Sequence, residues 1–365
     1  MKNRLLSLDI FRGITICFMI IVNTPGDWSI AYEPLKHAAW HGFTPTDLVF
    51  PSFVFITGVS SWFSFKSYNH TLTSALFMKI WKRAFIIFLL GVGLYAFPFY
   101  NKPISNWRIL GVLQRIALCY GVGATLGLLF KPKQLIGICA ALLLGYWGIL
   151  TAFGDLTMQG NAGQKLDLWL FGDSHLYHGE GIAFDPEGFL STMPSIVTYL
   201  IGYLIGGFMG TTDDKEKIMR TLSMIGMGLV VGGLIWNFAF PINKKLWTSS
   251  YVLFAGGLST LIFTLCYYIL DIKKVYEWSH FFRIFGTNAI LAYMVSELLV
   301  IISEYVHINE APDIVINGHE AFYRYFFALW LGSNNFSSFL FSIVFMLICW
   351  FVVYIFYRRG IFLKV

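Results

Sequence analysis

Charged residues are scarce in this sequence: only 13% of its 365 residues are Asp, Glu, Lys or Arg, whereas 57% are hydrophobic. A soluble domain of this size carries about 25% charged residues, so the composition excludes an ordinary soluble protein. The apolar residues come in long blocks, and a helix needs about 20 apolar residues to cross the hydrocarbon core of a bilayer. The sequence therefore predicts an all-α, polytopic integral membrane protein.

Cysteine is also sparse. Five cysteines fall inside apolar blocks without any paired spacing: Cys17, Cys119, Cys139, Cys266 and Cys349. This pattern excludes a disulfide framework and favours small core residues. The sequence has no linker or low-complexity tract, so we expect one membrane domain over residues 1–365. We expect no bound metal, because the pair His37 and His41 lacks a convincing third ligand.

The apolar blocks predict about ten membrane-spanning helices. They lie near residues 10–25, 47–65, 80–98, 109–130, 134–152, 190–210, 219–240, 250–270, 284–303 and 334–357. Most of the 26 Lys and Arg residues fall on the side of both termini, so the positive-inside rule places both termini in the cytoplasm. The net charge of +6 thus reflects topology, and we expect no nucleic-acid partner. The first block lacks a signal-peptide cleavage site, so we expect it to stay as a helix.

Three longer segments then lie on the outer side, near residues 26–46, 153–189 and 304–333. Function built on loops should concentrate there. The third segment ends in FYRYFFALWLG, which is too short to span a membrane and rich in aromatic residues. We expect an interfacial or re-entrant helix at this place.

Glycine recurs at four-residue spacing in two predicted spans. Gly202, Gly206 and Gly210 lie in one of them, and Gly228 and Gly232 lie in another. Small residues at this spacing let helix backbones approach closely. We interpret both patterns as helix packing, and glycines that face lipid would also allow a homodimer.

Polar residues inside the apolar blocks are candidates for function. Arg115 follows Gln114 in GVLQRIALCY, and a charge at the bilayer centre costs at least about 2.5–3.5 kcal/mol. Two interpretations stand for Arg115: an ion pair that holds helices together, or the lining of a polar cavity. Asn23 ends the first predicted helix and Asn288 begins the ninth, where either side chain could cap a helix or hydrogen-bond between helices.

The stretch KHAAWHGFTPTDLVFP, residues 36–51, places titratable groups directly before an apolar run. We expect Asp47 to be the N-cap of the second helix, because a carboxylate there accepts backbone N–H groups and complements the helix dipole. A carboxylate fixed in this way can also orient an imidazole. His37 is therefore a catalytic candidate with Trp40 as a neighbouring wall, although a loop histidine is more often simply solvated.

At these residues the sequence resembles a known family. RLLSLDIFRGITICFMIIVNTPG followed by HAAWHGFTPTDLVFPSFVFITGVS is similar to the heparan-α-glucosaminide N-acetyltransferase family and its bacterial relatives. The resemblance continues in WRILGVLQRIALCY, FDPEGFLSTMPSI, PINKKLWTSSYVL and FGTNAILAYMVSE. The lysosomal enzyme of this family has a further luminal domain and helix before this core, so we expect an acceptor other than heparan sulfate.

The resemblance implies a transmembrane acetyl transfer, from acetyl-CoA in the cytoplasm to the amine of a glucosamine-type sugar outside. The active-site histidine of the family falls on His37, and the asparagine of its VN motif falls on Asn23. A histidine can accept the proton that the amine must lose, either directly or after carrying the acetyl group itself. Asp47 would fix the imidazole tautomer, and Asn23 would donate to the thioester oxyanion.

Further residues are expected to bind the cofactor. Near the cytoplasmic mouth of a cavity, the CoA phosphates would be held by some of Arg12, Lys82, Arg83 and Arg283. These basic residues equally serve as charge that sets topology. Arg115 and Gln114 would line the route of the pantetheine arm, and Asn288 is a further cofactor candidate.

Sugars are recognised by carboxylates, amides and flat aromatic faces. These criteria select Trp40, Asp185, Glu187, Asn243 and Trp247 as candidates for binding the acceptor. The sequence from Asp185 to Gly188, D-P-E-G, equally predicts a structural turn.

Two other functions fit part of the sequence. A transporter for an amino sugar would use Arg115 and Asn288 inside the membrane, and an O-acyltransferase would act on an exported polysaccharide. The resemblance favours the N-acetyltransferase, in a bacterial inner membrane with the His37 loop facing the periplasm. Its expected partners are an amino-sugar or glycan acceptor and membrane lipid.

Overall fold

The structure is a computed structural model that describes residues 5–100, 103–311 and 314–363. Its helices form two compact units, and the chain passes between them several times. The first unit consists of Met1–His37, Thr44–Val49 and Ile269–Lys364, and the second of Ala38–Phe43 and Phe50–Tyr268. Both units are built from apolar helices, and the single membrane domain expected from the sequence stays a prediction.

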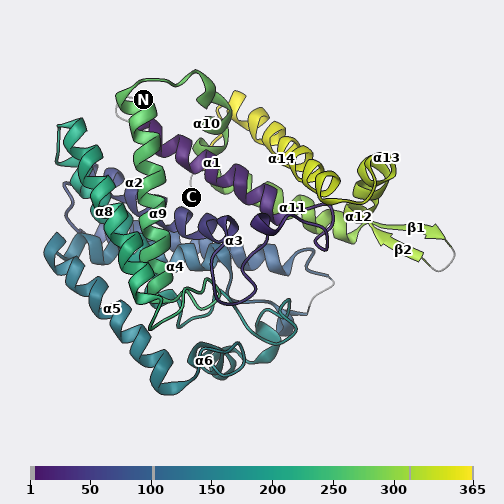
Figure 1. The fold of residues 1–365 in the computed structure, drawn as a ribbon, viewed down its shortest axis with the longest axis horizontal. Coiled ribbons are helices and arrows are strands. Elements are labelled where there is room, and N and C mark those ends of the chain that lie inside the picture. Colours follow the sequence, from purple (N-terminus) through teal and green to yellow (C-terminus); the bar gives the residue numbers. More distant parts are fainter. Residues whose placement is uncertain (1–4, 101–102, 312–313, 364–365) are drawn as a thin grey trace. The chain divides into compact units, whose positions relative to one another are not determined.

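The first unit contains helices and one small hairpin (Figure 1). Its helices are α1 (Leu6–Asn23), α10 (His280–Thr287), α11 (Ala289–Tyr305), α12 (Gly318–Tyr323), α13 (Leu329–Leu331) and α14 (Asn335–Arg358). The strands β1 (His307–Ala311) and β2 (Ile314–Asn317) pair in antiparallel fashion. Short 3₁₀ turns at Glu33–Leu35 and Pro45–Leu48 shape the region that follows α1.

The second unit holds the remaining long helices. They are α2 (Val49–Phe65), α3 (Ser74–Ala96), α4 (Val112–Leu129), α5 (Pro132–Phe153), α6 (Ala162–Phe171), α7 (Thr192–Gly210), α8 (Lys215–Trp236) and α9 (Ser249–Tyr267). Helices α3 and α4 pack against each other, as do α8 and α9, which run side by side in Figure 1.

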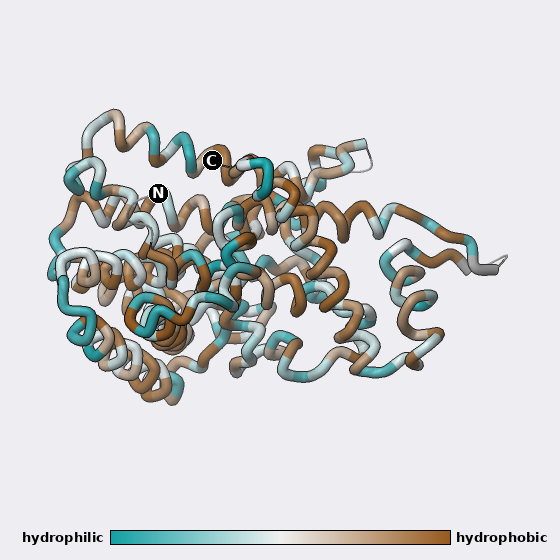
Figure 2. The backbone as a smooth tube through the Cα atoms, turned by 90° about the horizontal axis from the view of Figure 1, so that it is seen from above, coloured by the Kyte–Doolittle hydropathy of each residue, from teal (hydrophilic) through white to brown (hydrophobic). Residues whose placement is uncertain are grey.

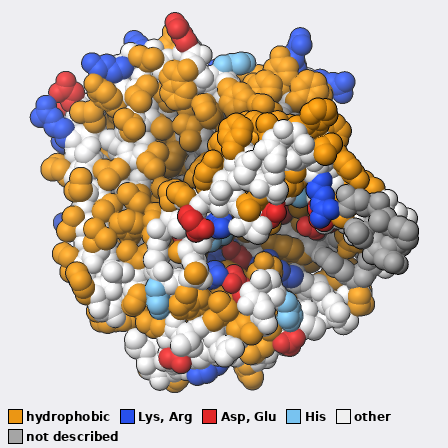
Figure 3. Space-filling view, turned by 45° about the vertical axis from the view of Figure 1, so that its right-hand side comes forward, with side chains coloured by type: hydrophobic (Ala, Val, Ile, Leu, Met, Phe, Trp, Pro, Cys, Tyr) orange, Lys and Arg blue, Asp and Glu red, His pale blue; other side chains and the backbone are white. Residues whose placement is uncertain are grey.

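Among the described residues, eight helices are long and apolar enough to cross a membrane, and a ninth results if α10 and α11 count as one span bent by 73°. Helices occupy all ten apolar blocks, but α3 carries Lys79, Lys82 and Arg83 in its first half. Figure 2 shows long hydrophobic stretches of backbone, and hydrophobic side chains cover broad areas of the face in Figure 3. The prediction of an all-α, polytopic membrane protein is confirmed.

The segment 304–333 departs from the prediction in one respect. It contains the β1–β2 hairpin, which hydropathy did not reveal because the strands are short and largely exposed. The aromatic stretch that ends the segment is helical as expected, through the end of α12, a π-helical turn at Arg324–Ala328, and α13. Segment 153–189 contains α6 and a 3₁₀ turn at Asp173–His175.

Glycine allows α2 and α7 to pack with their backbones in contact. A Cβ at Gly202 would lie 2.1 Å from the carbonyl oxygen of Phe55, and a Cβ at Gly58 would lie 2.0 Å from that of Tyr199. Helix packing therefore explains the Gly202 pattern, as the sequence predicted. The interpretation was wrong for Gly228, where a Cβ would meet no atom within 4 Å.

Replacing Gly202 by alanine should push α2 and α7 apart, because a Cβ cannot approach a carbonyl oxygen this closely. We expect the free energy of unfolding to fall by about 1–3 kcal/mol, which is the usual effect of overpacking. The measurement is the melting temperature of the purified protein in detergent. Gly228→Ala is the matched control, and equal melting temperatures for the two variants would contradict the packing.

Candidate active site

His37 and Asp47 meet within the first unit. Nδ1–H of His37 donates to Oδ1 of Asp47 at 2.7 Å. The imidazole stays 35% exposed, whereas the carboxylate is only 1% exposed. A neutral imidazole held in this way has its lone pair on Nε2, as in a general base whose tautomer is fixed by a buried carboxylate. The structure thus brings together two of the three residues predicted to act in catalysis.

The local sequence T-P-T-D explains the burial of Asp47. Thr44 is the N-cap of the 3₁₀ turn Pro45–Leu48, which leads into α2. The backbone N–H of Thr44 donates to Oδ2 of Asp47 at 3.0 Å and closes a capping box. The prediction that Asp47 is the N-cap was wrong by three residues, because Thr44 takes that position. As the acidic partner in the box, Asp47 keeps its Oδ1 for His37.

Asn23, the third predicted catalytic residue, is the last residue of α1, and its side chain is exposed. It belongs to the same unit as His37 and Asp47. The loop that starts directly after Asn23 leads to His37. The contribution of Asn23 to an oxyanion site stays a prediction.

A buried ion cluster lies in the second unit. Nε and Nη2 of Arg108 donate to the two carboxylate oxygens of Asp185 at 2.9 and 2.7 Å, and Nη2 also donates to Glu187 at 2.7 Å. The guanidinium lies 4.7 Å from the ring of Tyr95 and 4.6 Å from that of Tyr177. Burial opposes the charge, but Tyr95 and the two carboxylates raise the pKa of Arg108 well above its ordinary value. Both carboxylates predicted to bind the acceptor are therefore engaged by an internal cation.

Residues Asp185 to Gly188 form the turn that the sequence also predicted. The N–H of Gly188 donates to the carbonyl of Asp185 at 2.9 Å. Asp167 of α6 binds the next residue, because its Oδ1 accepts the N–H of Phe189 at 2.9 Å. A Cβ on residue 188 would lie 2.1 Å from Oδ2 of Asp167, so a larger residue there would displace this carboxylate.

Arg115 holds the same turn from α4, and it is 1% exposed. Nη2 donates to the carbonyl of Gly188 at 2.8 Å and to Oγ of Ser191, and Nη1 donates to Oγ of Ser195 at 3.0 Å. The ring of Trp247 lies 5.0 Å from the guanidinium. These hydrogen bonds go to hydroxyls and a carbonyl rather than to a carboxylate, which disfavours the interpretation of a simple ion pair.

Buried polar atoms without partners occur on residues predicted for the cofactor. Gln114 is 0% exposed, and neither its Oε1 nor its Nε2 has a hydrogen-bond partner among the described residues. Its amide lies against α3, where a Cβ at Gly91 would be 2.3 Å from Oε1. Nε of Arg83 also lacks a hydrogen-bond partner in the described part of the chain, and its guanidinium lies 4.9 Å from the ring of Tyr120. Such atoms cost about 1–3 kcal/mol each and call for a partner.

Other cofactor candidates join segments of the first unit. Nη1 of Arg12 donates to the carbonyl of Gly286 at 2.9 Å and so connects α1 with α10. Asn288 donates from Nδ2 to the carbonyl of Ile361 at 3.0 Å and accepts the N–H of Leu363 at 3.0 Å. Among the described residues, Asn288 thus connects the junction of α10 and α11 with the segment that follows α14, rather than capping a helix or bonding between two helices. Arg283 lies on α10. Lys82 lies on α3, in the second unit.

The remaining acceptor candidates lie in the second unit. Trp40 is half-buried, and its Nε1 donates to the carbonyl of Leu156 at 2.8 Å. Asn243 is 0% exposed, and its Nδ2 is 3.4 Å from Nδ1 of His41. Trp247 is 1% exposed, and its face is turned to Arg115 rather than to solvent. Of these three side chains, only Trp40 has an exposed part that an acceptor could reach.

Arg108, Asp167 and Thr44 are not among the site residues predicted from the sequence. The signal for Thr44 was present, since T-P-T-D has the spacing of a capping box. Arg108 and Asp185 are 77 residues apart, so only folding brings them together. Asp167 falls in a short amphipathic helix without a distinguishing motif. Over the residues that the structure describes, no three His, Cys, Asp or Glu side chains are placed to hold a metal ion.

Comparison with known proteins adds to this geometry. A family model described as heparan-alpha-glucosaminide N-acetyltransferase, catalytic, matches residues 4–231, which is more than half of the chain. The chain belongs to this N-acetyltransferase family. His37, Asp47, Arg108, Arg115 and the turn at Asp185 all lie inside the family match.

Two curated proteins illustrate the family relationship. The chain is 33% identical over 358 residues to heparan-alpha-glucosaminide N-acetyltransferase of Mus musculus, covering 81% of this chain and 54% of the relative. It is 31% identical over 427 residues to the protein of the same name from Homo sapiens, covering 99% of this chain and 60% of the relative. The chain thus spans little more than half the length of these two family members.

The turn at Asp185 should respond to pH through Asp167. Burial raises the pKa of Asp167 from 3.8 to about 7, against the hydrogen bond from Phe189. At pH values between 3.8 and about 7, the carboxyl group of Asp167 loses its proton in the unfolded chain but keeps it in the folded chain. The free energy of unfolding should therefore fall as pH rises from about 4 to 7, by up to about 1.4 kcal/mol per pH unit from this group.

Asp167→Asn tests this dependence, because the amide oxygen can still accept the N–H of Phe189. We expect the melting temperature of the variant to vary less between pH 4 and pH 7 than that of the wild type. A variant whose pH profile matches the wild type would contradict the role of Asp167.

Proposed function

We propose that this protein is a transmembrane N-acetyltransferase. It would transfer acetyl from cytoplasmic acetyl-CoA to the amine of a glucosamine-type sugar on the outer side of a bacterial inner membrane. The observation that carries the proposal is the bond between Nδ1 of His37 and the buried carboxylate of Asp47, in a chain that belongs to this family. The apolar helices support the membrane setting, and the uneven distribution of Lys and Arg supports the orientation.

The chemical step needs a base on the acceptor side. An ammonium group cannot attack a thioester, so the sugar amine first loses a proton. Nε2 of His37 would accept the proton, while Asp47 stabilises the imidazolium through Nδ1. The amine nitrogen then forms a bond to the acetyl carbon, the carbon–sulfur bond breaks, and the CoA thiolate takes a proton. Asn23 would donate a hydrogen bond to the carbonyl oxygen during the attack.

Residues of the second unit would hold the acyl donor. Gln114 presents a buried amide whose donor and acceptor both lack protein partners among the described residues, and Nε of Arg83 and of Arg115 are in the same condition. A polar ligand that reaches these atoms would remove the cost of leaving them unpaired. This supports the route of the pantetheine arm past Gln114 and Arg115, with Arg83 closer to the CoA phosphates.

Recognition of the acceptor is the second part of the proposal. Trp40 would offer its exposed part to a sugar face. Asp185 and Glu187 would contribute to acceptor binding without contacting the sugar, because Arg108 already binds both carboxylates. Asn243 and Trp247 would support the acceptor-binding residues from the interior of the second unit, since both are buried.

Purified protein supplied with acetyl-CoA and glucosamine should release free CoA and form N-acetylglucosamine. Mass spectrometry of the product and a thiol assay measure both. Uptake of glucosamine into sealed vesicles without CoA release would replace the proposal with a transporter. Release of CoA only with a polysaccharide that lacks free amines would replace it with an O-acyltransferase.

His37→Ala should lower the rate of transfer by about 10²–10⁴-fold, because the proton acceptor is lost. Asp47→Asn should cause a loss of similar size, since an amide can still cap the turn but its NH₂ cannot accept Nδ1–H. The pair His178 and Asp173 provides a matched control, because it is a histidine–aspartate contact of 3.1 Å with both side chains exposed. His178→Ala should transfer acetyl normally. A folded His37→Ala enzyme with wild-type rates would overturn the mechanism.

A single-turnover experiment separates the two routes open to His37. Enzyme mixed with labelled acetyl-CoA in the absence of acceptor is quenched and digested. Label on His37 identifies an acetyl-enzyme, and its absence identifies direct transfer with His37 as base.

A further inference from the structure

The loop that carries His37 is bound at its start by the C-terminal third of the chain. The loop leaves α1 through Pro25, Gly26 and Asp27. All three contact α12 or α14, and all of these elements belong to the first unit. Nε2–H of His319, on α12, donates to the carbonyl of Pro25 at 3.0 Å.

Gly26 fits closely against the same helices. Its N–H donates to the carbonyl of Ser338 at 3.2 Å. A Cβ on residue 26 would lie 2.3 Å from Cδ2 of Tyr323, which is inside van der Waals contact. Tyr323 is 3% exposed, and its hydroxyl lies 2.9 Å from Oγ of Ser337, so the ring has little freedom to move away.

Asp27 and Ser338 exchange two hydrogen bonds. The N–H of Asp27 donates to Oγ of Ser338 at 3.0 Å, and this hydroxyl donates to the carbonyl of Asp27 at 3.0 Å. Ser338 is 0% exposed, so these bonds are sheltered from water. Residues 25–27 with His319, Tyr323 and Ser338 are called the loop anchor below.

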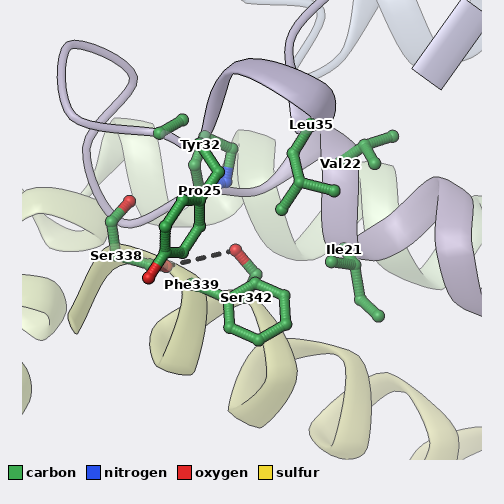
Figure 4. A pocket seen from close by; sticks show the side chains of 9 residues that line it. Ile21, Val22, Pro25, Tyr32, Leu35, Ser338, Phe339 and Ser342 are labelled. Carbon is green, nitrogen blue, oxygen red and sulfur yellow. Dashed lines mark hydrogen bonds between the residues drawn. The ribbon is translucent and has the colours of Figure 1, made fainter. Parts of the chain in front are cut away.

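The loop continues along α14 towards His37 (Figure 4). The ring of Tyr32 meets that of Phe339 edge-on, with centroids 6.0 Å apart. Leu35 and Tyr32 cover a small, partly open pocket of about 10 Å³, which Phe339 and Ser342 line from the side of α14.

The far end of the loop is attached at the capping box. Oγ1 of Thr44 donates to the carbonyl of Lys36 at 2.7 Å, and Oγ1 of Thr46 donates to the carbonyl of Pro34 at 3.3 Å. His37 therefore follows a segment that is held at the loop anchor on one side and at the capping box on the other.

We propose that the loop anchor is a positioning element for His37, supplied by residues 319–338, which lie outside the family match of residues 4–231. The expected effect of the loop anchor on turnover rests on the proposed function. Its expected effect on the position of the His37 imidazole does not. Displacing the anchor shifts Nε2 of His37 relative to the reacting amine without removing any group that binds a substrate.

The test compares Gly26→Ala and Ser338→Ala with the wild type. We expect kcat for acetyl transfer to fall about 10–100-fold, as for a misplaced catalytic group, while KM for both substrates changes less than twofold. The rate at which diethyl pyrocarbonate modifies His37, followed by mass spectrometry, should change in both variants. Gly137→Ala and Ser342→Ala are the matched controls. A Cβ at Gly137 would meet no atom within 4 Å, and among the described residues the hydroxyl of Ser342 donates to the carbonyl of Ser338 in its own helix.

The two readouts separate this inference from the proposed function. A wild-type protein that transfers no acetyl overturns the proposed function, and the modification rate of His37 still tests the anchor. Folded Gly26→Ala and Ser338→Ala proteins with wild-type kcat and wild-type modification of His37 overturn the inference. If Gly26→Ala does not fold, Ser338→Ala decides alone, because it removes two hydrogen bonds without adding an atom.

Discussion

One carboxylate serves two structures in this protein. Oδ2 of Asp47 accepts the N–H of Thr44 in the capping box of the 3₁₀ turn that leads into α2. Oδ1 accepts Nδ1–H of His37. The carboxylate is almost fully buried, so few waters compete for either oxygen. An imidazole bound at Nδ1 has a defined tautomer and a defined orientation. The proposed chemistry of His37 therefore depends on the same residue that starts the helix.

In the second unit, several charged side chains bind the single turn at Asp185. Arg108 binds the side chains of the turn, Arg115 binds its carbonyl at Gly188, and Asp167 binds the amide of Phe189. Burying five ionisable groups in one region is costly unless each is hydrogen-bonded. The bonds of Arg108 to both carboxylates and the hydrogen bonds of Arg115 and Asp167 meet this requirement. A turn held from three directions gives the neighbouring residues fixed positions.

The sequence predicted the helices well because their signal is local. Every apolar block became helical, and most of the described helices are long and apolar enough to span a bilayer. The β1–β2 hairpin was missed because its strands are short and do not alternate clearly between polar and apolar residues. The helix start was placed three residues late, although Thr44 carried the capping-box signal.

The site was only partly predictable. His37 and Asp47 are ten residues apart, so the sequence could suggest their contact. The contacts of Arg108 with Asp185 and of Arg115 with Gly188 join segments 73–77 residues apart, which no local pattern reveals. The buried state of Trp247 was also unpredictable, because its aromatic face serves a sugar or an arginine equally well. Long-range packing decides which of the two it contacts.

The contact between Asp27 and Ser338 joins residues 311 positions apart. A ribosome therefore makes the loop that carries His37 about 300 residues before it makes Ser338. The loop cannot form this contact until the intervening residues have been synthesised. Competence for chemistry would come only after α14 has been made and has bound the loop.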